Sequence, residues 1–257
     1  MTPTRSKKRL LSVVAVWGLA AGTVIASGNA FADDDPAPGE PGDVGTTIVG
    51  GAPVTENQPW IAALSGDNGF TCTSSQVDAE WIITAAHCVE NGGSFTVRIG
   101  SLDRTSGGVV RAVDEVNIHP DYNWPENDIA LLHLSEGFAN GYAPMADTRD
   151  VLLGQDATIY GWGSENSDWS GPLPEHLKYA DGVTSAQDCD TAGVVCVVGN
   201  GGVAGGDSGG PAFVRSPVTG EFVQVGVCAI GYRPTDGTWS GYTSIPDHAE
   251  WITTILG

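Results

Sequence analysis

The chain has 257 residues, of which 41% are hydrophobic and 16% charged, so it can bury a substantial core and is too apolar to be intrinsically disordered. It has 11 lysines and arginines against 31 aspartates and glutamates, a formal net charge of -20. Nucleic acids and anionic membrane surfaces attract clustered cations, so this balance argues against both as partners.

The first 32 residues have the three parts of a secretory signal peptide. Four of the 11 cations lie within the first nine residues, and an uncharged apolar run follows from Leu10 to about Ser27. Residues 30–32, Ala-Phe-Ala, form a small-residue cleavage signal. The alternative, an uncleaved membrane anchor, is disfavoured by this signal and by the acidic segment after it. We therefore expect cleavage after Ala32 and a secreted, extracellular protein whose mature form has no membrane span.

Residues 33–47 contain five acids, three prolines and three glycines but only two aliphatic side chains, which predicts a flexible segment. From Ile48 onward, short β-rich runs alternate with turn residues. The predicted strands are residues 60–64, 81–83, 95–99, 157–160 and 222–230. Apolar residues at helical spacing after Pro246 predict a short C-terminal helix over 247–256. The pattern is typical of an antiparallel all-β protein.

A serine in a glycine-rich turn, Gly206-Asp207-Ser208-Gly209-Gly210, is the most informative motif. Such a turn lets the hydroxyl project and gathers backbone N–H groups around one point, and nucleophilic acyl transfer needs both features. Most glycine-rich turns are only turns, however, so the motif alone is weak evidence of catalysis.

Two further motifs could supply a base and its partner. His87 lies in Thr-Ala-Ala-His-Cys, beside a cysteine. Asp128 directly precedes the apolar run from Ile129 to Leu132, where its carboxylate is expected to be partly buried. A buried acid needs a partner, and an imidazole N–H is a suitable one.

In the order His, Asp, Ser, these motifs resemble the chymotrypsin/trypsin family of serine endopeptidases, in its secreted bacterial type. The resemblance covers about residues 48–257. Further matches are Ile48-Val49-Gly50-Gly51, the run from Ile118 to Tyr122, Gly161-Trp162-Gly163, and the helix around Trp251. The resemblance implies an all-β fold of two six-stranded antiparallel barrels, about 48–150 and 151–246, with a C-terminal helix over 247–257.

The resemblance also implies roles for the motif residues. Ser208 would attack the peptide carbonyl, His87 would carry its proton to the leaving amine, and Asp128 would fix the His87 tautomer. The N–H groups of Gly206 and Ser208 would form the oxyanion hole. The remaining histidines are interpreted as structural or surface groups: His119, His133, His176 and His248.

The resemblance also implies activation by cleavage before Ile48, whose new amine would pair with Asp207. Residue 47 is threonine rather than arginine or lysine, so we expect a protease other than a trypsin-like one to remove residues 33–47 as a short acidic propeptide.

The five cysteines allow two bridges at most in an oxidising environment. The resemblance pairs Cys72 with Cys88 and Cys189 with Cys196, and leaves Cys228 as a buried free thiol. The family's bridge beside the specificity pocket is absent, because Ala204 replaces its first cysteine.

The specificity pocket is expected at four positions: Gly202, Ala229, Ile230 and Gly231. Gly202 stands where trypsin-like members have an aspartate, and Gly231 and Gly241 are expected to leave the walls open. Burial then favours cleavage after Phe, Tyr, Leu or Met over cleavage after Arg or Lys. The alternative is that Asp236 supplies a charge for a basic side chain.

The resemblance implies protein or peptide substrates, with proteinaceous protease inhibitors as further candidate partners, and a monomer. No cofactor is expected, and no metal either, because the loop after Gly100 lacks the family's carboxylate pair. Two other functions stay open: a catalytically weak or inactive homologue that binds proteins, and an esterase that uses the same triad.

Overall fold

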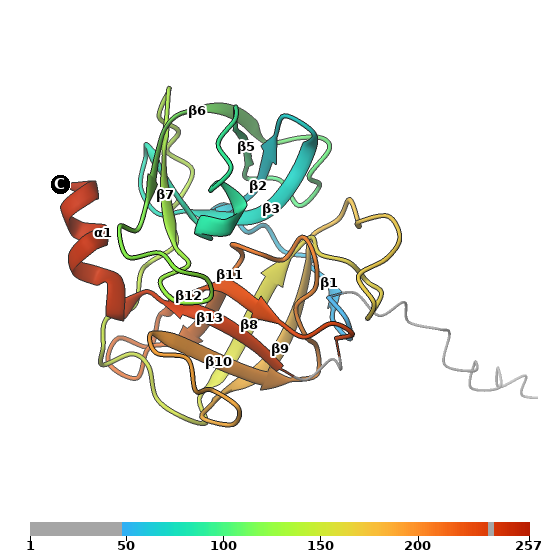
Figure 1. Cartoon of the computed structure of the whole chain (residues 1–257), viewed down its shortest axis with the longest axis vertical. Helices are drawn as coiled ribbons and strands as arrows, with labels where there is room; N and C mark the ends of the chain where they lie inside the picture. The colour runs from blue at the N-terminus through green and yellow to red at the C-terminus, as the bar shows by residue number, and fades with distance from the viewer. Residues whose placement is uncertain (1–47, 236–238) are drawn as a thin grey trace, which may run out of the picture. The chain divides into compact units, whose positions relative to one another are not determined.

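The computed structural model describes residues 48–235 and 239–257, which form two antiparallel β-barrels and a short C-terminal helix (Figure 1). The predicted all-β class and the two six-stranded barrels are confirmed. The expected signal peptide, the expected propeptide and Asp236 lie outside the described residues. In Figure 1 the first barrel is the upper half, in cyan and green, and the second is the lower half, in yellow to red.

The first barrel closes in the strand order β2-β3-β4-β7-β6-β5, with every neighbouring pair antiparallel. Its interior is filled by aliphatic side chains, among them Leu64, Ile82, Val97 and Leu132. The strands are β2 (Ile61–Gly66), β3 (Gly69–Gln76), β4 (Trp81–Thr84), β5 (Thr96–Ile99), β6 (Val109–Ile118) and β7 (Ala130–Leu134).

Strands β4 and β7 are apolar on both faces, because each face is covered. Successive side chains of a strand point to opposite sides. Ile82 and Leu132 therefore pack into the barrel, whereas their neighbours Ile83 and Leu131 pack with Ile252 of the C-terminal helix. This double burial explains the unbroken apolar run that follows Asp128 in the sequence.

The second barrel closes in the strand order β9-β10-β13-β12-β11-β8, because β8 also pairs with β9, and the short strand β1 is added to β9 outside this ring. The first short strand, which the sequence boundaries grouped with the first barrel, pairs with β9 instead. Ile48 likewise packs in the core of the second barrel. The strands are β1 (Ala52–Pro53), β8 (Asp156–Gly161), β9 (Lys178–Ser185), β10 (Val194–Gly199), β11 (Pro211–Arg215), β12 (Phe222–Gly231) and β13 (Trp239–Ser244).

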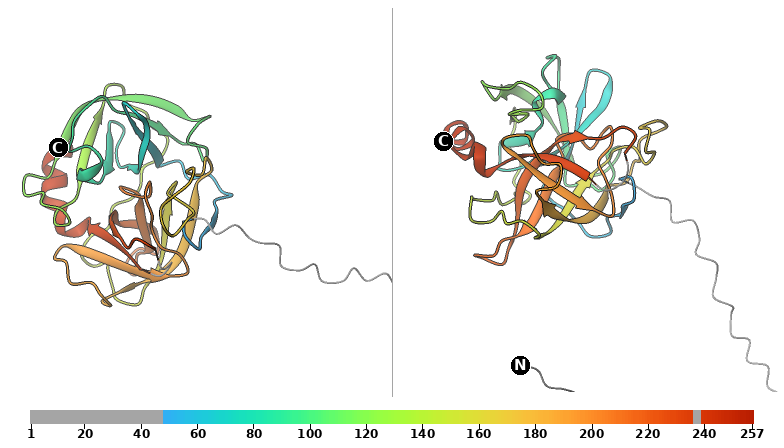
Figure 2. Two further views of the ribbon diagram at one scale, coloured as in Figure 1. Left: turned by 45° about the vertical axis from the view of Figure 1, so that its right-hand side comes forward. Right: turned by 60° about the horizontal axis from the view of Figure 1, so that its bottom comes forward.

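The C-terminal helix α1 runs over Ala249–Leu256, after a 3₁₀ turn at Pro246–His248. A proline is tolerated at such a start because its missing N–H would have no partner there. Although α1 follows the last strand of the second barrel, Ile252 packs against residues of β4 and β7. Figures 1 and 2 show the helix beside the first barrel from three directions.

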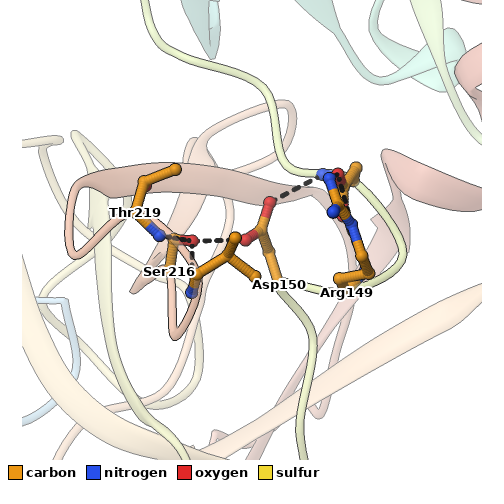
Figure 3. Close-up of polar contacts among 6 residues, drawn as sticks. Arg149, Asp150, Ser216 and Thr219 are labelled. Carbon is orange, nitrogen blue, oxygen red and sulfur yellow. Dashed lines mark hydrogen bonds and ion pairs between the residues drawn. The ribbon is translucent and has the colours of Figure 1, made fainter.

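The connection between the barrels is fastened to the turn between β11 and β12 (Figure 3). Asp150 is 7% exposed and accepts a hydrogen bond from the Ser216 hydroxyl. The Ser216 oxygen in turn accepts the N–H groups of Val218 and Thr219. Arg149, one residue away, pairs with Asp147 at the surface. One buried hydroxyl thus joins the linker to the second barrel.

Two disulfides join the pairs that the resemblance implied. Cys72–Cys88 ties β3 to the 3₁₀ turn Ala86–Cys88, and Cys189–Cys196 closes a loop before β10. Cys228 is the free cysteine among the described residues, and it is buried in β12.

Candidate active site

His87 and Asp128 meet because β4 and β7 pair in register. Thr84 lies opposite Ala130, so the turn after β4 and the residues before β7 leave the ladder at the same end. His87 Nδ1 lies 2.6 Å from Asp128 Oδ2, and the His87 backbone N–H donates to Asp128 Oδ1 at 2.9 Å. Asp128 is fully buried, whereas the His87 side chain is 26% exposed. The carboxylate can thus orient an imidazole whose other nitrogen remains available.

A second histidine–aspartate pair shows what sets the first one apart. His133 Nδ1 lies 2.6 Å from Asp114 Oδ1, the same separation as in the His87 pair. The Asp114 side chain is 50% exposed, and neither residue lines the cavity that contains His87. The hydrogen bond that the His133 ring donates to the Asp114 carboxylate raises the pKa of His133. His133 and Asp114 therefore have the features of a surface ion pair. From the sequence, His133 was interpreted as a structural or surface group.

Ser208 lies in the turn that enters β11, and the first barrel holds this turn in place. The Thr73 N–H donates to Ser208 O at 2.9 Å, and the Thr73 hydroxyl donates to Gly206 O at 2.9 Å. Gly206 and Gly209 have φ values of +104° and +77°, which favour glycine. A Cβ on Gly209 would lie 2.1 Å from Thr84 Oγ1, so the barrels approach too closely there for any side chain.

His87 and Ser208 line the same cavity, which has a volume of about 470 Å³. The described residues include no hydrogen bond between the Ser208 hydroxyl and the His87 ring. Such bonds often tighten only when substrate binds, so this geometry is compatible with a base and its nucleophile. The remaining lining residues are Glu90, Tyr122, Trp124, Trp169, Val203, Ala204, Cys228, Ala229, Ile230 and Gly231.

The N–H groups of Gly206 and Ser208 have no acceptor within residues 48–235 and 239–257. Around them, the N–H groups of Asp207, Gly209 and Gly210 all donate to backbone carbonyls. Two donors left unpaired beside a serine hydroxyl form a site where an oxyanion can bind.

Asp207 is fully buried, with two backbone donors and no cation around it in the described part of the chain. Gly163 N–H donates to its Oδ1 at 2.7 Å, and Ala204 N–H donates to its Oδ2 at 2.9 Å. Burial raises the pKa of Asp207 to about 7, although these two hydrogen bonds act in the opposite direction. A Cβ on Gly161 or Gly163 would lie within 2.2 Å of a carboxylate oxygen, which explains the Gly-Trp-Gly motif.

The residues that follow the expected cleavage site pack against the segment that leads to Ala204, one of the hydrogen-bond donors to Asp207. Ile48 is fully buried in the core of the second barrel. Val49 O accepts the Gly202 N–H at 3.0 Å. Gly202 lies two residues before Ala204, whose N–H donates to Asp207. A Cβ on Gly50 would lie 2.2 Å from Asn200 O, so the segment runs tightly against residues 200–202.

Three of the four expected pocket residues line the cavity, namely Ala229, Ile230 and Gly231, whereas Gly202 does not. The expectation that glycines leave the walls open is wrong. The position that a Cβ of Gly231 would occupy lies 2.9 Å from Val203 Cγ2, and that of Gly241 lies 3.0 Å from the Trp239 ring. The space left by each missing side chain is already filled by a neighbour.

Sequence reasoning missed the aromatic walls of the cavity, formed by Trp124 and Trp169. Trp124 is 57% exposed, and Trp169 lies in an otherwise polar run over residues 164–170. The sequence did contain a signal for these two residues, because each is a large apolar side chain in a polar, turn-rich segment. Such residues are favoured at binding surfaces.

Cys228 lines the cavity, but no described residue makes a hydrogen bond or an ion pair with its thiol. Burial, with Asp207 and Asp128 nearby, raises the pKa of its thiol well above the ordinary value. Such a thiol is a poor nucleophile and packs as a small apolar group.

Within the described ranges, the ligand atoms of Cys72, His87 and Cys88 lie close enough together to surround a metal ion. The two sulfurs are bonded to each other, so they cannot serve as thiolate ligands. Over the same ranges, no helix is long and apolar enough to cross a membrane.

Comparisons with known proteins agree with this geometry. The family model described as trypsin matches residues 48–252. "Serine protease SP24D" of Anopheles gambiae is 35% identical over 230 residues, which cover 82% of each chain. "Trypsin alpha" of Drosophila erecta is 32% identical over 80% of this chain and 86% of its own. "Brachyurin" of Leptuca pugilator is 30% identical over 82% of this chain and 99% of its own.

The fold is also similar to that of a solved structure, human heparin binding protein. The TM-score is 0.72 at 21% identity, over 81% of this chain and 96% of the other. The relatives named above come from two insects and a crab, so they support the family but not the bacterial type. Because the family model spans most of the chain and these relatives are serine proteases or trypsins over most of their lengths, the chain belongs to the trypsin family.

Proposed function

We propose that this protein is a secreted serine endopeptidase that cleaves peptide bonds through an acyl-enzyme intermediate. The observation that carries the proposal is the buried Asp128 at 2.6 Å from His87 Nδ1, with Ser208 in the same cavity. The protease relatives support peptides or proteins as its substrates.

In the first half of the reaction, Ser208 Oγ attacks the peptide carbonyl carbon while its proton passes to His87 Nε2. The carbonyl oxygen becomes an oxyanion, and the free N–H groups of Gly206 and Ser208 stabilise it. The buried Asp128 carboxylate stabilises the imidazolium that forms. His87 then protonates the leaving amine, the C–N bond breaks, and the acyl group remains on Ser208.

In the second half, a water molecule replaces the amine. His87 takes one proton from the water as its oxygen attacks the acyl carbon. The tetrahedral intermediate collapses, and His87 returns the proton to Ser208 as the carboxylic acid product leaves. Losing one oxyanion donor typically costs about 3 kcal/mol of transition-state stabilisation.

Cleavage before Ile48 is proposed to activate the enzyme. The buried Asp207 has no cation among the described residues, and its pKa is raised to about 7. A new α-amine at Ile48 would supply that cation and hold the Ser208 turn in position. Residues 1–32 are proposed as the signal peptide and 33–47 as the propeptide, with the catalytic domain over 48–257.

Two alternatives to the endopeptidase are compatible with the same fold. An inactive homologue would bind proteins without cutting them, and an esterase would use the same triad. The intact set His87, Asp128, Ser208 and Asp207 favours the endopeptidase over the first of these. We expect a monomer, and we expect proteinaceous protease inhibitors to bind the cleft.

The test combines labelling with digestion. A fluorophosphonate should modify Ser208 in protein that begins at Ile48, and a peptide library should be cut, as read by mass spectrometry. Ser208→Ala should lose both properties but keep its fold by circular dichroism. Labelling of another residue, or cleavage that persists in Ser208→Ala, would show that the nucleophile is misassigned.

A further inference from the structure

Two chain segments touch beside Ser208, where a substrate side chain would have to enter. One segment is Val203–Ala204, before the Ser208 turn, and the other is Ala229–Gly231, at the end of β12. The Cβ position of Gly231 lies 2.9 Å from Val203 Cγ2 and 3.0 Å from Val203 O. Because that spacing leaves no room for a methyl group on Gly231, the two segments are in contact there, and a large side chain could enter between them only if they separated.

Two buried hydroxyls lie against the Val203 backbone. Ser240 Oγ accepts the Val203 N–H at 3.1 Å, and the Thr235 hydroxyl lies beside the Val203 carbonyl. Thr235 Oγ1 lies 3.1 Å from Val203 O and 2.9 Å from Tyr232 O, and it accepts the Trp169 Nε1–H at 2.7 Å. Thr235 is 4% exposed. A hydroxyl has a single hydrogen, so it donates to one carbonyl at a time while it keeps the indole donor. One buried side chain therefore links three parts of the cleft wall.

The ring of Trp169 lies over the same contact. Its Cζ2 is 3.5 Å from the Cβ position of Gly231, and its Cε3 is 3.6 Å from that of Gly205. The Arg233 guanidinium lies 5.8 Å from the ring centroid and donates to Asp168 O at 2.9 Å. The indole is thus held by a hydrogen bond at its edge and a cation near its ring.

We propose that Trp169 and Thr235 form a clamp that keeps Val203 against Gly231, so the cleft selects peptides with glycine, alanine or serine before the scissile bond. This inference rests on the proposed peptidase function and names its substrate class. It replaces the expectation of Phe, Tyr, Leu or Met, which depended on open glycine walls.

The clamp has a weak point that makes it testable. Removing the Thr235 hydroxyl leaves the Trp169 N–H and the Val203 carbonyl without their buried partner, and such groups are costly to bury unpaired. The two segments should then separate, because water can reach these groups only if the contact opens. A large side chain should gain access as a result.

The experiment uses protein that begins at Ile48 and p-nitroanilide peptides that differ only in Ala, Leu or Phe before the scissile bond. The variants are Thr235→Val, which removes the hydroxyl, and Trp169→Phe, which keeps a ring without its N–H. Thr235→Ser restores the hydroxyl. Thr158→Val is the matched control, because the Thr158 hydroxyl binds Asp181 away from this cavity.

We expect the wild type to cleave the Ala peptide with kcat/KM at least about tenfold above the Phe peptide. Thr235→Val and Trp169→Phe should each shift this ratio about tenfold toward Phe, a change of the size that pocket fit produces. Thr235→Ser and Thr158→Val should keep the wild-type ratio. A merely structural role would change the stability of the protein and leave the ratio unaltered.

Wild-type preference for Phe or Leu would overturn the clamp, and so would an unchanged ratio in both clamp variants. If Thr235→Val does not fold, Trp169→Phe decides. Calorimetric binding of the uncleaved Ala and Phe peptides to a Ser208→Ala background gives the same ratio without catalysis. If fluorophosphonate fails to label Ser208 and nothing is cut, the peptidase proposal fails, and these binding ratios still decide the clamp.

Discussion

The His87 side of the cleft and the Trp169 side are held by different kinds of interaction. His87 follows a strand that is buried on both faces, and the Cys72–Cys88 disulfide fixes its turn to β3. On the opposite side, side-chain hydrogen bonds hold the wall. The Thr235 hydroxyl lies between Trp169 and Val203, and Ser240 Oγ accepts the Val203 N–H. Covalent and strand-ladder constraints hold the proposed catalytic residues in place, whereas side-chain hydrogen bonds hold the wall that we propose selects the substrate. Substitutions on the two sides should therefore change different quantities.

The largest effect is expected at Asp128. Asp128→Asn replaces an acceptor with an amide that favours the wrong His87 tautomer, so kcat should fall roughly 10⁴-fold for every peptide. The Ala-to-Phe ratio should not change, because the Trp169 side is untouched. Asp114→Asn is the matched control, since Asp114 makes a histidine contact of the same length at the surface. Steady-state kinetics would contradict the prediction if both variants lost activity equally.

The next effect concerns pH and the pro-segment. The folded-state pKa of Asp207 is about 7, above its ordinary 3.8, so folded protein retaining residues 33–47 holds a proton that unfolded protein releases. Stability should then fall as pH rises from about 4 to 7, by on the order of 4 kcal/mol. Protein that begins at Ile48 should keep its stability, because the new amine pairs with the ionised acid.

Urea unfolding at the two ends of this pH range measures the difference. Asp207→Asn in the longer protein serves as the control, since it removes the titrating group and should flatten the pH dependence. Parallel pH curves for the long and short proteins would mean that the Ile48 amine does not reach Asp207.

The disulfides come next. Cys72–Cys88 spans 16 residues and Cys189–Cys196 spans seven. Replacing each pair by alanines should cost about 3 and about 2 kcal/mol, because the longer loop loses more entropy when closed. Only loss of the first bridge should also lower kcat, since it holds the turn with His87. Thermal unfolding and kinetics of the two double variants would test both statements.

The smallest effects are expected for Ser216 and Arg149, which lie outside both sides of the cleft. They provide a baseline for the changes in kcat and in the peptide ratio. Ser216→Ala should cost about 1–3 kcal/mol, because Asp150 loses its hydroxyl donor in a buried site. Arg149→Ala, whose side chain is 70% exposed, should cost less than about 1 kcal/mol. Neither change should alter kcat or the peptide ratio. A shift in the ratio would mean that the linker acts on the pocket.

The described residues from Ile48 onward show how much of the fold local sequence patterns can predict. The apolar run around Ile82 predicted a strand. The run from Ile129 to Leu132 predicted only that Asp128 is partly buried, and the structure shows that it also forms a strand. Alternate side chains of both strands fill two separate cores. The C-terminal helix could also be predicted from the sequence, since Ile252 and its apolar neighbours repeat at helical spacing. The placement of β1 could not be predicted, because two residues carry no periodicity and their pairing with β9 spans more than a hundred positions.

For the site, the motifs around His87, Asp128 and Ser208 could be found in the sequence, because each depends on a few adjacent residues with a distinctive chemistry. What fills the space beside Gly231 could be learned only from the folded chain. Val203, Trp169 and Thr235 lie in three separate segments, and the bond from Trp169 to Thr235 joins positions 66 apart in the chain. A glycine predicts an absent side chain at its own position. Whether the resulting space stays open depends on side chains that folding brings from elsewhere, and no local pattern encodes their approach.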